Sequence, residues 1–429
     1  MNNQGGQLAC REFNEFSRRR FLAVSAAAGA AATLPEWMPR VSMARDYRSS
    51  QRDVLIVAFL RGGADALTIC PPFLEQPYYD ARPTLAIPPP SSSSPNRAIN
   101  LDGQFGLAPA MAPILPAYED GRLLFVHAVG SQDYTRSHFE AARLMEIGVE
   151  DPASPTGWLT RHLNLVPADA QAVLRGIAIS DGVPKSLFGA SRVLPIPDPG
   201  NFSLRGDPIT QAFRYEMIRN SYVSSREPTR SFALSTYNTV SLLSQLDFDS
   251  YQPGGGAEYP ETRSGRTLRA AAAITKAQVG VEVMTIELGL TNWDLHQAQS
   301  PFSGIMAREM DHLSRCLDAF RRDMFAGSSP SFTLVAMSEF GRTLHENASG
   351  GTDHGHGGMM MVMGSAVHGG RVLTQWPGLA PEQLYESRDL AATFDYRDIL
   401  AEILEQRLGN PSVGGVFSDF QPTFRGVFA

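Results

Sequence analysis

Several short, uninterrupted runs of apolar residues constrain the fold of this chain more than any other feature. Residues 53–60, 122–129 and 281–288 are such runs. Residues 331–337 and 359–364 are two more, one on each side of a polar loop. Runs of this length are typical of parallel strands that are covered on both faces. Because helix-length segments lie between them, we expect an α/β fold with a largely parallel central sheet.

The composition is that of an ordinary globular protein. The 429 residues can form one large domain or two smaller ones, and a hydrophobic content of 43% is enough for a full core. The formal net charge is -7, and the chain has no long basic run after its N-terminal segment. This balance argues against nucleic acid as the main partner.

The N-terminal segment resembles a twin-arginine export signal. Three arginines at residues 18–20 precede an alanine-rich run, residues 23–32, that is too short and too weakly apolar to span a membrane stably. We expect residues 1–44 to be signal peptide and leader, and residues 45–429 to be one mature domain without a membrane span. The resemblance implies the twin-arginine translocation machinery as a partner and a periplasmic or secreted location.

The cysteines leave two alternatives open. Cys10 belongs to the leader. Cys70 and Cys316 would either form a disulfide in an oxidising compartment or remain two separate buried thiols, and their spacing does not decide between these.

The polar loop between the last two apolar runs holds a dense group of metal-binding residue types. It reads SEFGRTLHENASGGTDHGHGG and contains Glu339, Asp353, His354 and His356. Carboxylate oxygen and neutral imidazole suit zinc, manganese or iron, and the glycines let the backbone bend around an ion. The alternative is a polar surface loop in which these residues serve turns and caps.

Polar residues also follow two other apolar runs. Asp65 comes after the paired glycines Gly62 and Gly63, where it is either a ligand or the cap of a turn. Asp294 and His296 are two residues apart, so on extended backbone both point the same way and chelate one ion. Ligands of open α/β sheets bind at the carboxyl ends of the strands. We therefore expect these residues to converge on one edge with the polar loop.

Ser137 stands at the expected start of a helix that follows the second run. There its hydroxyl would meet free backbone N–H groups and the positive end of the helix dipole, which stabilise an ionised nucleophile. Serine is also a favoured N-cap residue, so a purely structural role is an equal alternative. Arg136 and His138 flank it and are placed to contact an anionic substrate, Arg136 through two parallel hydrogen bonds to phosphate or sulfate.

Periodicity and composition predict the remaining elements. The Pro- and Ser-rich stretch 71–116 is expected to be a surface excursion. Helices are expected at residues 158–165, 208–222, 230–246, 262–278, 302–325 and 395–407, and a further strand at residues 174–179.

Five motifs together resemble the DUF1501 family. They are FLRGGADAL, YTRSHFEA, NWDLHQ, SEFGRT and GGTDHGHG, and they span nearly the whole mature chain. That family is regarded as similar in fold to the alkaline phosphatase superfamily, which includes sulfatases and cofactor-independent phosphoglycerate mutases. The resemblance implies a three-layer α/β/α sandwich, with metals at the carboxyl ends of the strands.

The resemblance also implies roles for residues near the first three motifs. Asp65 matches the superfamily's metal-binding Asp after the first strand. Ser137 matches its nucleophile at a helix start, with Thr135 in reserve. Asp294 and His296 resemble a later metal-binding pair.

The last metal-binding pair of the superfamily allows two alignments. In one, TDHGHG itself supplies the pair through Asp353 and His354. In the other, Glu339 takes the place of the Asp and His354 or His356 supplies a late histidine. We prefer the second, because the apolar run leads directly into Glu339. Phe340 then stands where the superfamily has a metal-binding histidine.

The resemblance and the residues imply an exported metal-dependent hydrolase of phosphate or sulfate esters. A divalent ion, zinc or manganese, would activate Ser137 or a water, and Arg136 or Arg342 would hold the non-bridging oxygens. The alternative is a non-catalytic secreted protein that binds or assembles on a hydrolase-like scaffold.

Overall fold

The computed structural model describes residues 53–429 except 134, 169–171, 200–206, 228, 245, 247 and 249. Within this part of the chain, nine strands form one sheet. They are β1 (Val54–Phe59), β4 (Leu123–Gly130), β5 (Gly176–Ile179), β6 (Val193–Pro195), β7 (Val283–Glu287), β8 (Phe332–Met337), β9 (Gly358–Gly364), β10 (Arg371–Leu373) and β11 (Phe394–Asp395). The order is β10-β4-β9-β8-β1-β7-β5-β6, with β11 beside β4. A separate antiparallel pair consists of β2 (Ile99–Asn100) and β3 (Gly106–Leu107).

The sheet is parallel except for β9. This strand pairs antiparallel with both β4 and β8, whereas β1 pairs parallel with β7 and β8. The chain therefore leaves β8 and enters β9 at the same edge, which is also the carboxyl edge of β1, β4 and β7. The expected mostly parallel sheet is confirmed, and the antiparallel direction of β9 keeps the whole polar loop on that edge.

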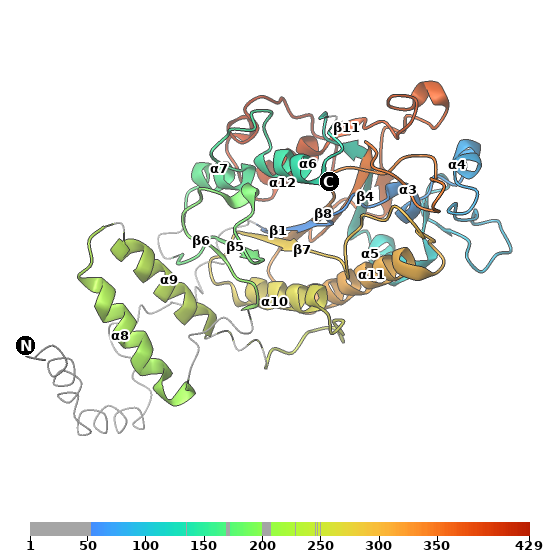
Figure 1. The fold of residues 1–429 in the computed structure, drawn as a ribbon. Coiled ribbons are helices and arrows are strands. Elements are labelled where there is room, and N and C mark those ends of the chain that lie inside the picture. Colours follow the sequence, from blue (N-terminus) through green and yellow to red (C-terminus); the bar gives the residue numbers. More distant parts are fainter. Residues whose placement is uncertain are drawn as a thin grey trace, which may run out of the picture. The chain divides into compact units, whose positions relative to one another are not determined.

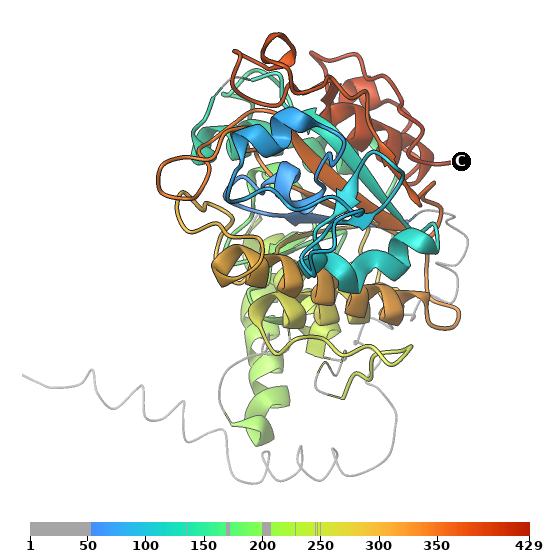
Figure 2. The same cartoon turned by 90° about the vertical axis from the view of Figure 1, so that its right-hand side faces the viewer.

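Helices cover both faces of the sheet (Figures 1 and 2). The α-helices in the described residues are α3 (Ala66–Ile69), α4 (Gln76–Ala81), α5 (Leu115–Glu119), α6 (His138–Ile147), α7 (Trp158–Leu165), α8 (Gln211–Val223), α9 (Thr229–Ser244), α10 (Arg263–Ala277), α11 (Gly304–Phe325) and α12 (Tyr396–Gln406). In Figure 1, α5, α10 and α11 lie on one side of the sheet, and α6, α7 and α12 lie on the other. Because helices cover both faces, the strands between them are apolar without interruption.

Strand β1 shows how each face is filled. Ile56 and Ala58 belong to the apolar cluster that includes residues of α10 and α11. Leu55 and Val57 belong to the cluster on the side of α7 and α12. Successive side chains of a strand point to opposite faces, so a strand between two helix layers must be apolar at every position.

The helices lie close to where the periodicity predicts them. Residues 158–165 are helical as expected, and the helix expected at 302–325 runs over Gly304–Phe325. Ser137 is the N-cap of α6, as the sequence indicates. Cys70 and Cys316 are both free and buried, so the structure contains two separate thiols. No helix of the described residues is both long and apolar enough for a membrane crossing.

Candidate metal centre

Loops from four strands meet at the carboxyl edge of the sheet. The segment after β4 leads into α6, whose first residue is His138. The loop after β7 carries Asp294 and His296, and the loop between β8 and β9 carries Glu339 and His354. Because β1, β4, β7 and β8 share one direction, residues far apart in the sequence are brought together here.

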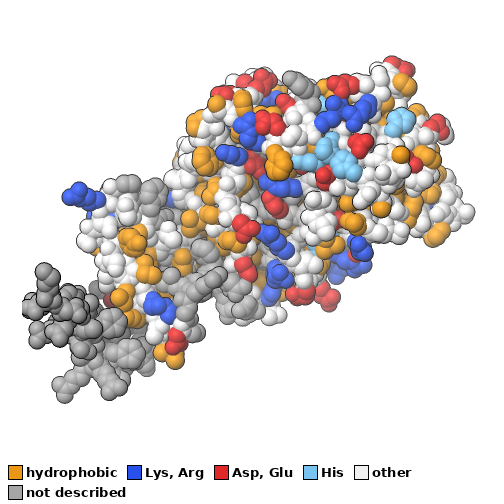
Figure 3. All heavy atoms as spheres, viewed as in Figure 1, with side chains coloured by type: hydrophobic (Ala, Val, Ile, Leu, Met, Phe, Trp, Pro, Cys, Tyr) orange, Lys and Arg blue, Asp and Glu red, His pale blue; other side chains and the backbone are white. Residues whose placement is uncertain are grey.

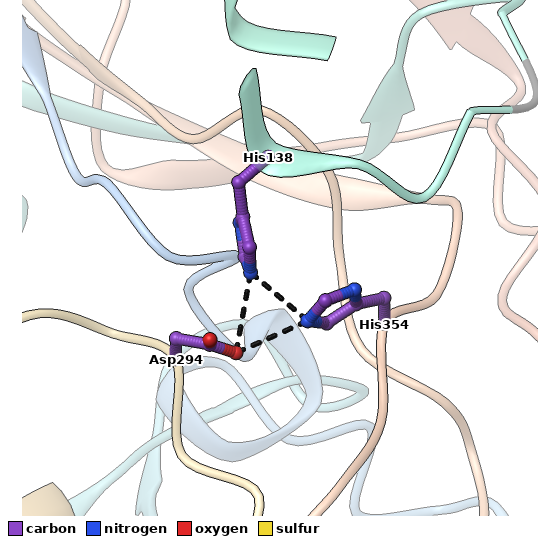
Figure 4. Close-up of side chains that lie close together, drawn as sticks. All are labelled: His138, Asp294 and His354. Carbon is purple, nitrogen blue, oxygen red and sulfur yellow. Dashed lines mark hydrogen bonds and ion pairs between the residues drawn. The ribbon is translucent and has the colours of Figure 1, made fainter. Parts of the chain in front are cut away.

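Four side chains form what we call the His/Asp cluster: His138, Asp294, His296 and His354. The Oδ1 atom of Asp294 lies 3.2 Å from His138 Nε2 and 3.1 Å from His354 Nε2 (Figure 4). The two Nε2 atoms are 2.9 Å apart. His296 Nε2 lies 2.9 Å from Asp294 Oδ1 and 2.9 Å from His354 Nε2. All three imidazoles thus present the same ring nitrogen to one carboxylate oxygen.

The opposite nitrogen of each ring has an acceptor outside the cluster. These acceptors are Glu339 Oε1 at 2.6 Å from His138 Nδ1, Asp353 Oδ1 at 2.9 Å from His296 Nδ1, and the Arg136 carbonyl oxygen at 2.7 Å from His354 Nδ1. Carboxylates and carbonyls only accept hydrogen bonds, so each Nδ1 donates its proton. A neutral ring with its proton on Nδ1 has a lone pair on Nε2, so in the neutral form these lone pairs face one another. Burial opposes the charged form of His138, but Glu339 and Asp294 outweigh it and raise the pKa of His138.

A single cation satisfies this arrangement better than a proton does. A proton on one ring can bridge only one of the two short Nε2–Nε2 contacts, which leaves lone pair against lone pair in the other. A metal ion accepts the Nε2 atoms of His138 and His354 and the Oδ1 atom of Asp294 together, since these three atoms all lie within 4.8 Å of one another. The outward Nδ1–H bonds are also the usual partners that orient metal-binding histidines.

The charges around the cluster keep the carboxylates of Asp294 and of its neighbour Glu339 ionised. Burial favours the neutral acid of Asp294, but the hydrogen bond and charge of Arg342 outweigh it and hold the pKa of Asp294 well below its ordinary value. Burial likewise opposes ionisation of Glu339, and the hydrogen bond from His138 turns the balance so that the pKa of Glu339 is lowered. Burial lowers the pKa of His354, which favours its neutral, lone-pair-bearing form.

The cluster is open to solvent on one side. The side chains of His138 and His354 are each 23% exposed, that of Asp294 29% and that of His296 42%. Figure 3 shows histidine side chains gathered on this surface. The donors are therefore accessible to a molecule from solution, unlike those of a site buried in the core.

Glu339 and Asp353 contact histidines of the cluster and do not belong to the cluster itself. Both are expected as metal ligands, but each accepts a hydrogen bond from a histidine of the cluster instead. Glu339 Oε1 also accepts from the backbone N–H of Gly62 at 2.8 Å. The reason is that β8 ends close to β1, which directs Glu339 towards the turn after β1. His138, expected only as a substrate contact, lies beside Asp294 instead. Its position after β4 corresponds to that of Asp294 after β7, and this correspondence could have indicated its place in the cluster.

Asp65 and His356 lie outside the cluster, contrary to the expectation. Asp65 is buried and makes a two-point ion pair with Arg82, with oxygen–nitrogen distances of 2.7 and 3.1 Å. It also accepts from Thr68 and from Gln299. Both of its carboxylate oxygens accept hydrogen bonds that stabilise the fold. The position of Asp65 after a strand could not predict its pairing with Arg82.

His356 is held apart from the cluster by its own packing. Its Nδ1 accepts a hydrogen bond from the backbone N–H of Ala392 at 3.3 Å. Its ring stacks on Tyr385, with centroids 3.9 Å apart. His354 and His356 thus have different surroundings, although they are only two residues apart.

Arg342 is a structural residue, contrary to the expected role at a substrate. Its side chain is 1% exposed. Its donors are occupied by Asp294 and by backbone carbonyls, including that of Gly63 at 2.7 Å and that of Thr352 at 3.0 Å. Because these N–H groups already donate hydrogen bonds inside the protein, Arg342 orients Asp294 and cannot reach a substrate.

Arg136 and Ser137 lie beside the cluster. Arg136 forms ion pairs with Glu386 at 2.5 Å and Asp389 at 2.9 Å, both through Nη2. Ser137 is exposed and its side chain makes no capping hydrogen bond. Its backbone N–H donates to the hydroxyl of Thr135, the reserve nucleophile, at 3.3 Å.

The fold and the site define an α/β protein with a His/Asp cluster at the carboxyl edge of a mostly parallel sheet. Residues 250–410 match a family model described as "Protein of unknown function (DUF1501)", a range that includes Asp294, His296 and His354. Residues 15–35 match the TAT (twin-arginine translocation) pathway signal sequence. The protein is therefore exported by the twin-arginine pathway, to the periplasm or out of the cell.

Neither the curated proteins nor the solved structures contain a match to this chain. The alkaline-phosphatase-like identity of the fold accordingly stays a prediction.

Replacing Glu339 by glutamine is expected to weaken divalent metal binding about 10- to 100-fold, because the acceptor that fixes the His138 ring loses its charge. Isothermal titration with manganese or zinc measures the change. Glu346→Gln, in the same loop but bonded to Thr84 and Leu85, is the matched control. Equal affinities in the two variants would contradict an orienting role for Glu339.

Proposed function

We propose that this exported protein is a metal-dependent hydrolase of phosphate or sulfate esters. The observation that carries the proposal is the convergence of three imidazole Nε2 atoms on one carboxylate oxygen, with every Nδ1 proton directed away from the centre. His138, Asp294, His296 and His354 would hold a divalent ion, zinc or manganese. Such an ion would polarise an ester oxygen and stabilise charge on a leaving group.

The spacing of the donors favours manganese over zinc. For metal–donor distances of about 2.1 Å, neighbouring donors lie about 3.4 Å apart in a tetrahedron and about 3.0 Å apart in an octahedron. Five of the six donor separations are 2.9 to 3.2 Å, the exception being the pair His138 and His296. For His138, Asp294 and His354 these separations correspond to neighbouring corners of an octahedron, which leaves the other positions for His296, substrate or water.

The remaining residues support hydrolysis by orientation and electrostatics. Glu339 and Asp353 accept hydrogen bonds from His138 and His296, so both rings are oriented before an ion binds. Arg342 holds the carboxylate of Asp294 ionised. Ser137 lies at the exposed N-terminus of α6, directly before His138, where a hydroxyl without a capping bond is available as a nucleophile.

A second candidate function is a metal-stabilised binding protein without catalysis. The number of donors favours it: four protein ligands fill a tetrahedral zinc, and closed four-ligand sites are usually structural. The solvent exposure of His296 and Asp294 favours the hydrolase instead.

Metal analysis of the purified exported protein, followed by turnover of chromogenic phosphate monoesters, phosphate diesters and sulfate esters, tests the proposal. We expect about one divalent ion per chain and turnover of at least one ester class, lost in Ser137→Ala if the hydroxyl is the nucleophile. Bound metal without turnover of any of these esters would favour the binding protein. No stoichiometric metal would overturn both.

A further inference from the structure

A small polar pocket lies next to the His/Asp cluster and is not used by it. Its lining includes Arg136, Glu339, Phe340, His356 and Tyr385, and its volume is about 10 Å³. A space of this size admits one water-sized atom or group. Glu339 contacts His138 of the cluster, and the Phe340 ring lies 4.7 Å from the His138 ring, so the pocket and the cluster share a wall.

Two buried N–H groups on the pocket lining have no acceptor within hydrogen-bond distance, although the Ser131 backbone lies near His356. Among the described residues, Arg136 Nε and His356 Nε2 are buried nitrogen atoms without a hydrogen-bond partner. His356 as a whole is only 9% exposed. Leaving a buried donor unsatisfied costs about 1–3 kcal/mol, so such groups normally serve a bound molecule or ion.

The hydrogen bonds fix which atoms carry these protons. The backbone N–H of Ala392 donates to Nδ1 of His356, so Nδ1 bears the lone pair and Nε2 bears the proton. Both ion pairs of Arg136 use Nη2, which leaves the Nε–H group uncommitted. Stacking on Tyr385 holds the His356 ring in place. The pocket is therefore lined by two residues whose buried N–H groups lack a hydrogen-bond acceptor.

The carboxylates on the lining are themselves engaged. Glu339 accepts from His138 and from the N–H of Gly62, and Asp133 accepts from the N–H of Thr135 at 2.7 Å. Their lone pairs are partly neutralised, so they oppose an incoming oxygen less than free carboxylates would.

We propose that this pocket binds one non-bridging oxygen of the anionic ester, with His356 Nε2–H and Arg136 Nε–H as the two donors. The inference rests on the proposed hydrolase function and assigns His356 a substrate-binding role in place of the metal-binding role expected from the sequence. Phosphate and sulfate present the same tetrahedral oxygens, so the pocket fits either. Donors held in position before the reaction stabilise charge on such an oxygen without reorganisation.

Binding of inorganic phosphate and of inorganic sulfate to the manganese-loaded protein, measured by titration calorimetry, tests the proposal. His356→Phe keeps a ring against Tyr385 and removes the donor, and Arg136→Lys keeps the charge and removes Nε–H. We expect each variant to lose about tenfold in affinity for the preferred anion, with manganese affinity unchanged. The exposed His345→Ala, in the same polar loop, is the control and should bind like the unmodified protein.

Two results would overturn the inference. One is phosphate and sulfate affinity unchanged in both variants while manganese is retained. The other is a crystal structure of the phosphate complex in which a water occupies the pocket and the anion lies elsewhere. Failure to bind manganese at all is a different outcome, because it removes the proposed hydrolase function and with it this inference.

Discussion

The His354→Ala protein is expected to lose stoichiometric divalent metal. His354 Nε2 lies within 3.1 Å of each of the other three donors, His138, Asp294 and His296, so its removal takes away the nitrogen that all of them share. Loss of an outer partner alone costs 10- to 100-fold in affinity, and loss of a ligand costs more. We expect a fall of at least about 100-fold, measured by metal analysis after dialysis and by calorimetry.

His345→Ala is the matched control for this experiment, because it removes an exposed imidazole from the same loop. Its metal content should equal that of the unmodified protein. Metal retained in His354→Ala at the original stoichiometry, or lost equally in both variants, would show that the cluster is not the metal site.

The second large effect is expected from Arg82→Met, which leaves Asp65 buried without its counter-charge. Arg82 is 0% exposed and Asp65 2%. The guanidinium also donates to the backbone carbonyls of Thr343 and Leu344, each at 2.8 Å, and so ties the polar loop to α4. Removing one partner of a buried pair costs about 3–5 kcal/mol, because the remaining charge stays uncompensated. Equilibrium unfolding in urea measures the loss.

Two further variants separate the buried charge from general damage. Arg315→Met breaks an exposed ion pair with Asp311 and should cost less than about 1 kcal/mol. The double variant Asp65→Leu/Arg82→Met should be more stable than Arg82→Met alone, since no charge is left buried. A double variant less stable than the single one would contradict this account.

The same ion pair predicts a dependence of stability on pH. Burial opposes ionisation of Asp65, but the charge and hydrogen bonds of Arg82 outweigh it, so the pKa of Asp65 is lower in the folded than in the unfolded protein. Its contribution is therefore complete above the unfolded pKa of about 4 and is lost as the pH falls towards the folded pKa. Urea unfolding between pH 6 and pH 3 should show a smaller decline in the double variant than in the unmodified protein.

Much of the fold follows from local patterns in the sequence. Each apolar run is a strand because both faces of the sheet are covered, as for β1 and β8, and α11 lies within two residues of its expected bounds. Asp294 and His296 lie together because two residues on extended backbone share a side. Local patterns did not predict that β9 runs antiparallel to its neighbours. The direction of a strand depends on the strands with which it pairs.

The roles of single side chains depended on partners far along the chain. Glu339 and Asp353 have the chemistry of ligands, yet each contacts a histidine ring instead. Arg342 has the chemistry of an anion contact, yet backbone carbonyls of Gly63 and Trp293, in two other loops, surround it.

The order of apolar runs and the chemistry of the residues after them specified an exported α/β protein with metal-binding groups near strand ends. Whether a given carboxylate, guanidinium or imidazole faces the cluster, a neighbouring ring or the interior was decided only by tertiary packing. The physical reason is that residue type and local backbone fix which hydrogen bonds a side chain can make, whereas the groups that complete those bonds are supplied by strands and loops distant in sequence.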